Sequence, residues 1–541
     1  MRIAFALTCL ATACGMAFTA TVMSQTSPGA HRMPVVPAEL LERPIALHTG
    51  IGVSHDSLST LSPDAQRFYD QGLSYLHNYV WIDAARSFNQ ALRLDSRLSM
   101  AYIGLSLALV GVNQRAAAQD AFAHAASQPP ANEHERLHRL VRERQIAAEN
   151  APGRTEALSL YRKTLDDALA ALPVDVELWL QRGVAESPDA GDRGQGSPPS
   201  AVPFFTKALA LSPDHFAAHH YLTHAFENGG GTEDALIHGA AYARLAPEVP
   251  HARHMFGHDL RRVGRISEAI AEFEAADRLE TAYFAAEHVA PDNDWHYEHN
   301  LELTGTSYQY AGQMRRAAPL LEKAFELPTS NLVQAVNKRQ WPAFLRARGE
   351  PARALAAARV LATHPNGVVQ AIGHIEAAHA LIATGQLNDA ATESNTALAL
   401  LRKGEPGSAL ASIEMQLLQG EFFLRTGQRD KGRDTLARGL AAARAAPGPD
   451  EWAQALFTLE AVATSARQTG DWEFAADVAK QMIAHDPAYA GSQYARGLVA
   501  ERDGDRSAAR TAFATAVTLW KQADSDLPAL LDAQRRLMAV P

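Results

Sequence analysis

The sequence predicts an all-α fold, an α-solenoid of about eleven or twelve helix pairs. From Asp64 onward, small and large apolar residues recur every 34 residues, as Ala84 and Ala118 or Phe88 and Phe122 do. In addition, 47% of the 541 residues are hydrophobic, which is enough for an extended core. One helix pair cannot bury its own apolar face, so neighbouring pairs must stack.

The first 24 residues predict a secretory signal peptide. Arg2 provides a positive start, residues 3–20 are uncharged and apolar, and small residues precede a cleavage site after Ser24. A membrane anchor is the alternative, but the run is marginal for spanning a bilayer. Lipoprotein anchoring at Cys14 is a weaker alternative, because the expected Leu is missing. The mature chain is therefore expected in the periplasm or outside the cell, without a membrane span.

Composition narrows the classes of function. Both cysteines, Cys9 and Cys14, lie in the signal segment, so a metal site in the mature chain must use His, Asp or Glu. The net charge is −10 and the pI is about 6.1. Because no dense cluster of Lys and Arg is present, we expect no nucleic-acid partner.

Downstream of the signal peptide, four regions are predicted. Residues 25–63 are rich in Pro, Gly, Ser and Thr and form an extended, partly disordered lead-in. Residues 64–213 form N-terminal repeats, and residues 214–331 form central repeats rich in histidine. Residues 332–541 form C-terminal repeats that end in a cap helix, which shields the last pair from solvent.

The repeat is similar to the tetratricopeptide repeat (TPR). Gly257, Ala269, Phe273 and Ala276 show its pattern in one repeat, and the resemblance covers residues 64–541. Small residues let the two helices of a pair approach closely, and large residues fill the space between them. The resemblance implies a TPR-type solenoid whose concave groove, lined by the first helix of each pair, binds ligands such as proteins or peptides.

Histidine is concentrated in the central repeats. Eleven of the 22 histidines lie between residues 215 and 299. His220 and His254 are 34 residues apart, as are His224 and His258. Because this spacing equals the repeat length, these residues occupy equivalent positions in successive repeats.

These equivalent positions predict one histidine-lined face. When repeats begin at residues 216, 250 and 298, places two, five and nine share a face of the first helix. The residues at these places are His220, His224, His251, His254, His258, His299 and Glu302. His296 lies one turn before His299 on the same stripe.

A transition-metal site is the chemistry that this pattern favours. Packed helices lie roughly 8–10 Å apart, so imidazoles from neighbouring helices can reach one ion. Imidazole-rich sites select copper, iron or zinc, and this set could hold one ion or a small cluster. Glu287, Asp292 and Asp294 are further candidates, as oxygen ligands or as acceptors behind the ligands.

Two roles remain open for this groove. The first is a metal-binding protein or a metalloenzyme, the latter requiring an open coordination position. The second is a metal-free periplasmic scaffold, in which the histidines donate hydrogen bonds to a peptide or protein partner. His219, His238 and His288 are expected to be packed or hydrogen-bonded residues instead.

Beyond the repeat itself, the chain resembles a group of secreted bacterial TPR proteins that have no settled activity. The resemblance lies in HFAAHHYLTHAFE, HARHMFGHDLRRVGR and WHYEHNLEL. It implies histidine at the positions of His215, His220, His224, His251, His254, His258 and His299. This chain departs from the group at Trp81, where histidine is usual, so its centre is expected to differ there.

One further motif, at residues 134–138, matches a catalytic pattern in an unsuitable context. Residues 134–138 read HERLH, which matches the HExxH pattern of zinc proteases. The helix is crowded with arginine, and no third ligand follows at a familiar spacing. We therefore expect a solvated helical face here, and not a protease.

Overall fold

The computed structural model describes residues 36–329, 331–446 and 451–539. The predicted signal peptide, with Cys9 and Cys14, lies outside the described residues. Within these ranges the chain forms 27 α-helices and two short 3-10 helices, and no β-strand. Apart from α1 (Ala38–Leu41), α16 (Leu332–Asn337) and α27 (Pro528–Ala539), the helices form 12 consecutive pairs. The predicted all-α, TPR-type solenoid of eleven or twelve pairs is confirmed.

The pairs follow one another along the chain. The N-terminal pairs are α2 (Pro63–His77) with α3 (Trp81–Leu94), α4 (Ser99–Gly111) with α5 (Arg115–Ser127), α6 (Glu133–Glu149) with α7 (Thr155–Ala171), and α8 (Val176–Val184) with α9 (Val202–Leu211). The central pairs are α10 (Phe216–Gly229) with α11 (Thr232–Leu245), α12 (Pro250–Arg262) with α13 (Ile266–Glu287), and α14 (Tyr297–Tyr310) with α15 (Met314–Glu326). The C-terminal pairs are α17 (Gln340–Ala347) with α18 (Pro351–Ala362), α19 (Gly367–Ala383) with α20 (Leu387–Leu401), α21 (Ser408–Arg425) with α22 (Arg429–Ala445), α23 (Glu451–Gln468) with α24 (Trp472–His485), and α25 (Ala490–Arg502) with α26 (Arg506–Leu519).

Close contact between a glycine and a phenylalanine fixes the two helices of several pairs. A Cβ atom added to Gly183 in α8 would lie 2.3 Å from the ring of Phe205 in α9. The same contact joins Gly257 in α12 to Phe273 in α13, at 2.7 Å. Both phenylalanines are fully buried. The small residue therefore allows the close approach, and the large residue fills the core between the helices.

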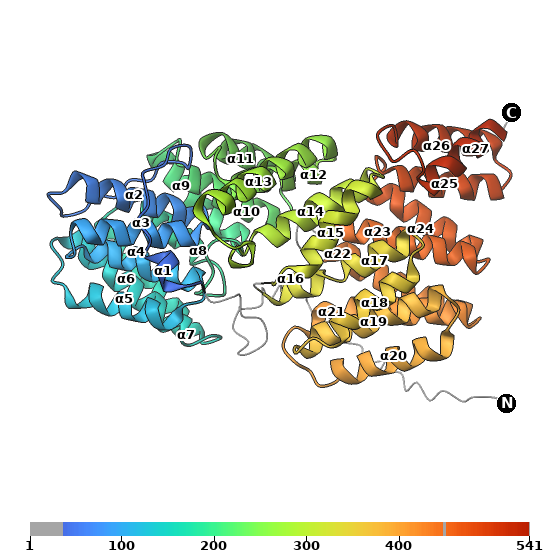
Figure 1. Cartoon of the computed structure of the whole chain (residues 1–541), viewed down its shortest axis with the longest axis horizontal. Coiled ribbons are helices and arrows are strands. Elements are labelled where there is room, and N and C mark those ends of the chain that lie inside the picture. Colours follow the sequence, from blue (N-terminus) through green and yellow to red (C-terminus); the bar gives the residue numbers. More distant parts are fainter. Residues whose placement is uncertain (1–35, 330, 447–450, 540–541) are drawn as a thin grey trace.

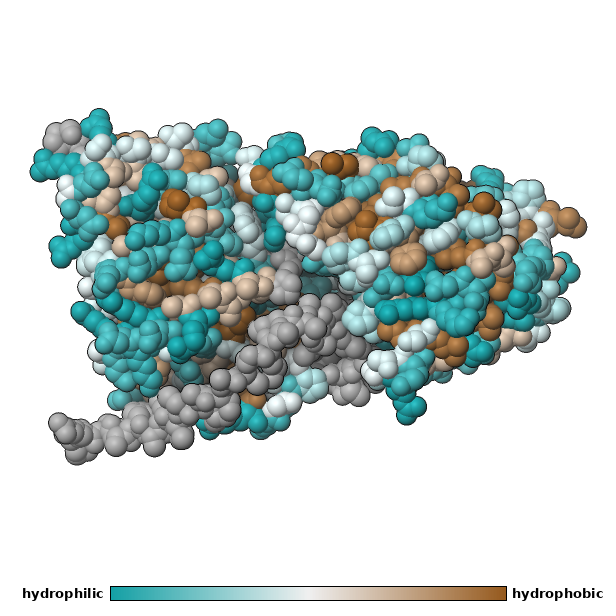
Figure 2. Space-filling view, turned by 180° about the vertical axis from the view of Figure 1, so that it is seen from behind, coloured by the Kyte–Doolittle hydropathy of each residue, from teal (hydrophilic) through white to brown (hydrophobic). Residues whose placement is uncertain are grey.

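The pairs lie side by side along the longest axis of the molecule. Figure 1 shows the N-terminal repeats at one end, the C-terminal repeats at the other, and α10 to α14 between them. From behind, Figure 2 shows a mostly hydrophilic face over which apolar residues are scattered. None of the described helices is long and apolar enough to span a membrane.

The segment before the first pair packs along the repeats as a strap (residues 42–62), which contains no helix. The side chain of Asn78 donates a hydrogen bond to the carbonyl of Ile51 at 2.7 Å, and the backbone N–H of Glu248 donates to Gly50 at 2.9 Å. Gly52 adopts a φ of +80°, and a Cβ atom there would lie 2.3 Å from the ring of Phe216. The strap therefore links the end of α2 to α10 and to the loop after α11, and glycine is required where the strap crosses Phe216.

Candidate metal centre

Three neighbouring helices bring the predicted histidines together. Helix α10 carries His220 and His224, and α12 carries His251, His254 and His258. Helix α14 carries His299, and His296 is its N-cap residue. All seven side chains are buried except that of His299, which is partly exposed. Their burial away from water means that each imidazole nitrogen needs a partner within the protein.

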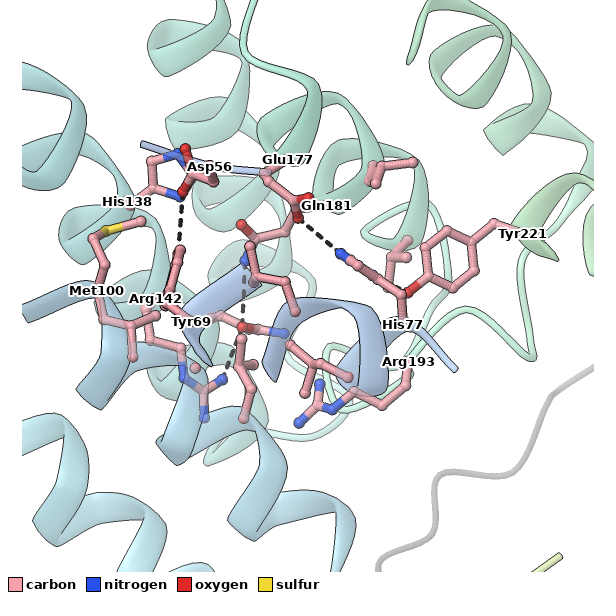
Figure 3. A pocket seen from close by; sticks show the side chains of 18 of the residues that line it. Asp56, Tyr69, His77, Met100, His138, Arg142, Glu177, Gln181, Arg193 and Tyr221 are labelled. Carbon is pink, nitrogen blue, oxygen red and sulfur yellow. Dashed lines mark hydrogen bonds and ion pairs between the residues drawn. The ribbon is translucent and has the colours of Figure 1, made fainter. Parts of the chain in front are cut away.

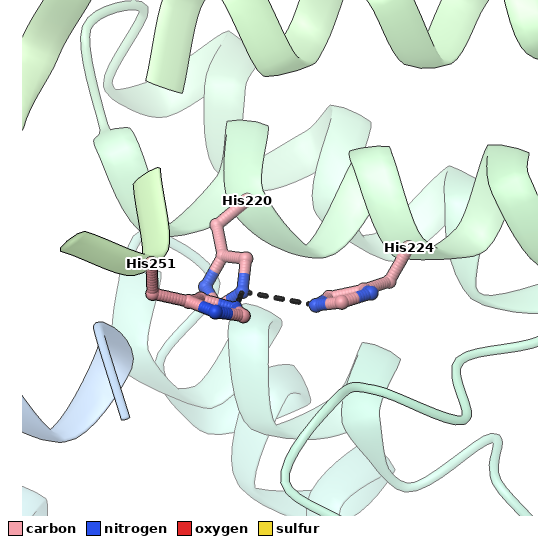
Figure 4. A group of neighbouring side chains, drawn as sticks. All are labelled: His220, His224 and His251. Atoms are coloured by element: carbon pink, nitrogen blue, oxygen red, sulfur yellow. Dashed lines mark hydrogen bonds between the residues drawn. The ribbon is translucent and has the colours of Figure 1, made fainter. Parts of the chain in front are cut away.

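The structure divides six of these residues into two groups. The first histidine triad consists of His220, His224 and His251. The Nε2 atom of His220 lies 3.1 Å from that of His224 and 3.0 Å from that of His251 (Figure 4). Two nitrogens bound tetrahedrally to one ion at 2.0–2.1 Å would lie about 3.3 Å apart. The triad is thus close to the spacing that a shared ion requires.

The second histidine triad consists of His254, His258 and His299. Its ring centroids are 4.5 Å apart between His254 and His258, and 5.0 Å apart between His254 and His299. One nitrogen from each ring lies within 4.8 Å of the others. In both triads, two histidines one helical turn apart are completed by a histidine from the next first helix.

His296 lies between the two triads. Its ring centroid is 5.0 Å from that of His251 and 4.3 Å from that of His254. The Nδ1 atom hydrogen-bonds to the Glu280 carboxylate at 2.5 Å, whereas Nε2 has no hydrogen-bond partner among the described residues. A carboxylate on one nitrogen and a free lone pair on the other is the arrangement of a metal-ligating histidine.

Backbone and amide oxygens orient the other rings in the same manner. Nδ1 of His220 lies 2.7 Å from the carbonyl oxygen of His77, and Nδ1 of His254 lies 2.9 Å from Oδ1 of Asn300. Since an oxygen can only accept, the proton of each neutral ring sits on Nδ1. The lone pair of Nε2 is therefore directed into the triad.

One carboxylate serves both triads from behind. Oε2 of Glu227 lies 3.7 Å from Nδ1 of His224, and Oε1 lies 3.4 Å from Nδ1 of His258. Glu227 is in α10, one turn after His224. Neither contact is a hydrogen bond, so Glu227 acts on both triads through its negative charge, which offsets part of the charge of bound cations.

Burial keeps these histidines neutral. Desolvation lowers the pKa of His220, His251, His254 and His296 well below the ordinary value, and it lowers the pKa of His224 to about 3. Neighbouring imidazoles lower each of these pKa values further. Neutral imidazole is the form that binds a metal ion, so these five histidines need no deprotonation near pH 7.

Aromatic residues cover the first triad. The ring of Tyr79 lies 4.6 Å from that of His220 and 5.1 Å from that of His251. Tyr79 has a φ of +61°, a strained conformation for a bulky residue, and Trp295 donates a hydrogen bond to its carbonyl at 3.1 Å. Trp81 stacks on Tyr79 at 5.1 Å and so contacts a residue that covers the triad.

The predicted oxygen ligands are placed differently. The Glu302 carboxylate accepts a hydrogen bond from Gln340, and the structure brings it into neither triad. Glu287 forms an ion pair with Arg86 at 2.8 Å. Asp294 accepts the backbone N–H of His296 at 2.7 Å and so caps α14, while it also lies in a group with Glu280 and His296. Asp292 is exposed in the same loop.

Other histidines lie outside the triads. His219 and His238 contact each other through their Nδ1 atoms at 2.8 Å, as expected for a hydrogen-bonded pair. The expectation of a solvated face for residues 134–138 is wrong, because His138 is only 7% exposed and hydrogen-bonds to Asp175 at 2.9 Å. Glu135 accepts the backbone N–H of Ala131, and this contact at the start of α6 occupies the residue that a zinc protease uses as its base.

A cavity of about 100 Å³ lies beside the first triad, within the N-terminal repeats. Figure 3 shows Asp56 and His138 at one side of it, and His77 with Tyr221 at another. Nε2 of His77 lies 2.8 Å from the Glu177 carboxylate, and Nδ1 of His77 lies 2.8 Å from the Tyr221 hydroxyl. The backbone carbonyl of His77 accepts the hydrogen bond from His220. Buried polar contacts thus connect the cavity wall to the first triad.

Comparisons with known proteins give no activity for this chain. No protein-family model and no curated protein matches the sequence. Similar solved structures include a TPR protein from Parabacteroides merdae (13% identity, TM-score 0.34, 52% of this chain and 99% of that one). Others are a human IFIT1 dimer with m7Gppp-AAAA (13%, 0.40, 78% and 90%) and yeast Tom70 (14%, 0.32, 88% and 95%). At these TM-scores, the fold assignment rests on the helix pairs of this chain.

Sequence reasoning missed the residues that orient or surround the ligands. Glu227 and Asn300 could have been suspected, because each lies one turn or less from a predicted ligand on the same helix. Glu280 and Tyr79 gave no such signal, since they reach the site from α13 and from the loop after α2. Only the packing of separate helices brings them to the histidines.

Proposed function

We propose that this protein is an exported, transition-metal-binding solenoid that holds one ion in each histidine triad. The observation that carries this proposal is that Nε2 of His220 lies 3.1 Å from Nε2 of His224 and 3.0 Å from Nε2 of His251. The same helical arrangement is repeated 34 residues later in the second triad. Residues 1–24 support the exported location.

Three neutral imidazoles define the kind of ion. Nitrogen ligands without thiolates favour copper, zinc or iron over the hard cations calcium and magnesium, which prefer oxygen. The adjacent triads, with ring centroids of His251 and His254 at 6.0 Å, would place two ions in one buried centre. Such proximity suits a centre in which both ions act on one bound molecule.

The number of protein ligands favours a metalloenzyme within this proposal. Structural zinc sites use four protein ligands, whereas catalytic sites use three and keep a position for water or substrate. Each triad supplies three. His296, with Nε2 unpartnered among the described residues, is a candidate seventh ligand between them.

A metal-free scaffold for a protein or peptide partner is the second candidate. It is favoured by the Nε2 contacts of His220, which could be hydrogen bonds between rings of different tautomers. Against it stands the burial of six of the seven histidines, which leaves little of their surface for a partner.

Elemental analysis of the mature protein, purified without an affinity tag or chelator, tests the proposal. We expect the triads to account for about two equivalents of copper, iron or zinc, and the variant His224→Ala/His258→Ala to lose these two. His219→Ala/His238→Ala is the matched control, since it removes a contacting histidine pair from the same repeats but outside the triads. A parent that takes up no ion after each has been supplied would refute metal binding and make partner capture the next experiment.

A further inference from the structure

A second cluster of metal-ligating side chains lies in the N-terminal repeats, away from the triads. Helix α6 places His134 and His138 one turn apart, with ring centroids at 4.3 Å. Asp56 comes from the strap, and Asp175 is the N-cap residue of α8. Three separate segments thus contribute two imidazoles and two carboxylates.

The ligand atoms of this cluster converge. Oδ1 of Asp56 lies 2.9 Å from Nε2 of His134, whereas Oδ2 of Asp175 lies 2.9 Å from Nε2 of His138 and 3.0 Å from Nδ1 of His134. One ligand atom each from Asp56, His134 and His138 lies within 4.8 Å of the other two. We propose that Asp56, His134 and His138 bind one Zn²⁺ ion, with the Asp175 carboxylate beside both imidazoles, and that the ion thereby fastens the strap to the N-terminal repeats.

Contact geometry at His134 supports an ion. Its Nε2 atom is buried and forms no hydrogen bond, although an oxygen of Asp56 is only 2.9 Å away. The oxygen therefore lies off the axis of the nitrogen lone pair. This geometry is expected of two ligands that share one cation. The cation then lies on the lone-pair axis of the nitrogen, and the carboxylate oxygen binds the cation from the side.

Each carboxylate is also oriented from behind. The hydroxyl of Tyr69 donates to Oδ2 of Asp56 at 3.1 Å, and the backbone N–H of Leu178 donates to Oδ1 of Asp175 at 3.0 Å. The other oxygen of each carboxylate faces the imidazoles. Such outer contacts hold metal ligands in place and are typical of built sites.

Charge and ligand type select zinc. Two carboxylates and two neutral imidazoles balance a divalent cation, and two nitrogens with a carboxylate oxygen suit tetrahedral Zn²⁺. Calcium and magnesium would require more oxygen ligands. Glu135, which a zinc protease would use as its base, already accepts the backbone N–H of Ala131, so the proposed ion is structural.

A proton is the competing occupant. Burial alone would lower the pKa of His134, but the neighbouring carboxylates of Asp175 and Asp56 raise it to about 10. A protonated His134 between two carboxylates would hold the cluster together without metal. The experiment must therefore separate a cation from a proton.

Zinc content measured by elemental analysis, after zinc loading and gel filtration, makes this separation. We expect His138→Gln and Asp56→Asn each to lose one equivalent, while ions in the triads remain. His55→Ala is the matched control, because His55 also lies in the strap and pairs with an aspartate, Asp70, at 2.8 Å. If Asp56→Asn and His138→Gln keep the zinc content of the parent, with helix content unchanged by circular dichroism, the proposal is overturned.

Hydrogen exchange of the strap provides the second readout. In the parent, a chelator should accelerate exchange in residues 42–62, and added zinc should restore protection; in Asp56→Asn, neither treatment should change it. Strap exchange that ignores zinc in the parent would indicate a protonated ion-pair cluster. The variant His224→Ala/His258→Ala separates this proposal from that of metal binding by the triads. This variant should keep the one equivalent of zinc at the strap even if the triads bind nothing.

Discussion

The central and C-terminal repeats share one architecture, but they carry different side chains at the same position of the first helix of each pair. Six residues before the glycine that ends the first helix, the central repeats carry His224 and His258. At the same place, α19 carries His379 and α21 carries Glu421. In the C-terminal repeats, Nδ1 of His379 therefore meets Oε2 of Glu421, at 2.7 Å.

This difference explains why equal positions lead to different chemistry. An imidazole that faces a carboxylate has its hydrogen bond and its charge partner, so the pair is complete without a ligand. Imidazoles that face one another direct lone pairs to a common point, and burial makes that arrangement costly without a cation. A histidine in a groove therefore predicts a metal only when its neighbours in space are also ligands.

The largest expected effect distinguishes two separate ions from one shared cluster. His220→Ala should remove the ion of the first triad, and His299→Ala should remove that of the second, so each variant loses one of the two equivalents that the triads bind. The reason is that neither residue belongs to the other triad. Elemental analysis of both variants measures this. Loss of both triad equivalents in either variant would indicate a single cluster of seven histidines.

A smaller effect is expected from the carboxylate behind both triads. Glu227→Gln should weaken binding at both sites by about 10–100-fold, as is typical when a partner of a ligating histidine is lost. Titration with the ion found in the parent, by calorimetry, measures the two affinities. Glu268→Gln, which removes an exposed carboxylate of the same repeats, is the control. An effect on one site alone would show that Glu227 does not couple them.

The smallest effect on metal is expected in the C-terminal repeats. His379→Ala should leave the metal content unchanged, because Glu421 already completes its contacts there. It should lower the free energy of unfolding by about 1–3 kcal/mol, since the half-buried carboxylate loses a hydrogen bond. Chemical denaturation together with elemental analysis tests both statements. A drop in bound metal would mean that the comparison between the two regions is mistaken.

The 34-residue spacing was sufficient to predict the stacked helix pairs and the face on which the histidines lie. This succeeded because helix periodicity and repeat length fix which residues share a face, independently of distant contacts. The same rule placed His220 with His224 and His254 with His258. It also placed Glu302 on that face, where the structure instead pairs it with Gln340.

Only the tertiary structure decided how the predicted ligands group. The sequence could not show that His251 completes the triad of α10 while His299 completes that of α12, because this depends on the stagger between neighbouring helices. It also could not bring Asp56 and Asp175 to the HERLH helix. Asp56 lies 78 positions before His134 and Asp175 lies 37 positions after His138, neither shares a repeat position or a motif with that helix, and they meet it only through packing. Periodicity along one helix is a local property, whereas a metal site depends on distances between segments, which packing alone sets.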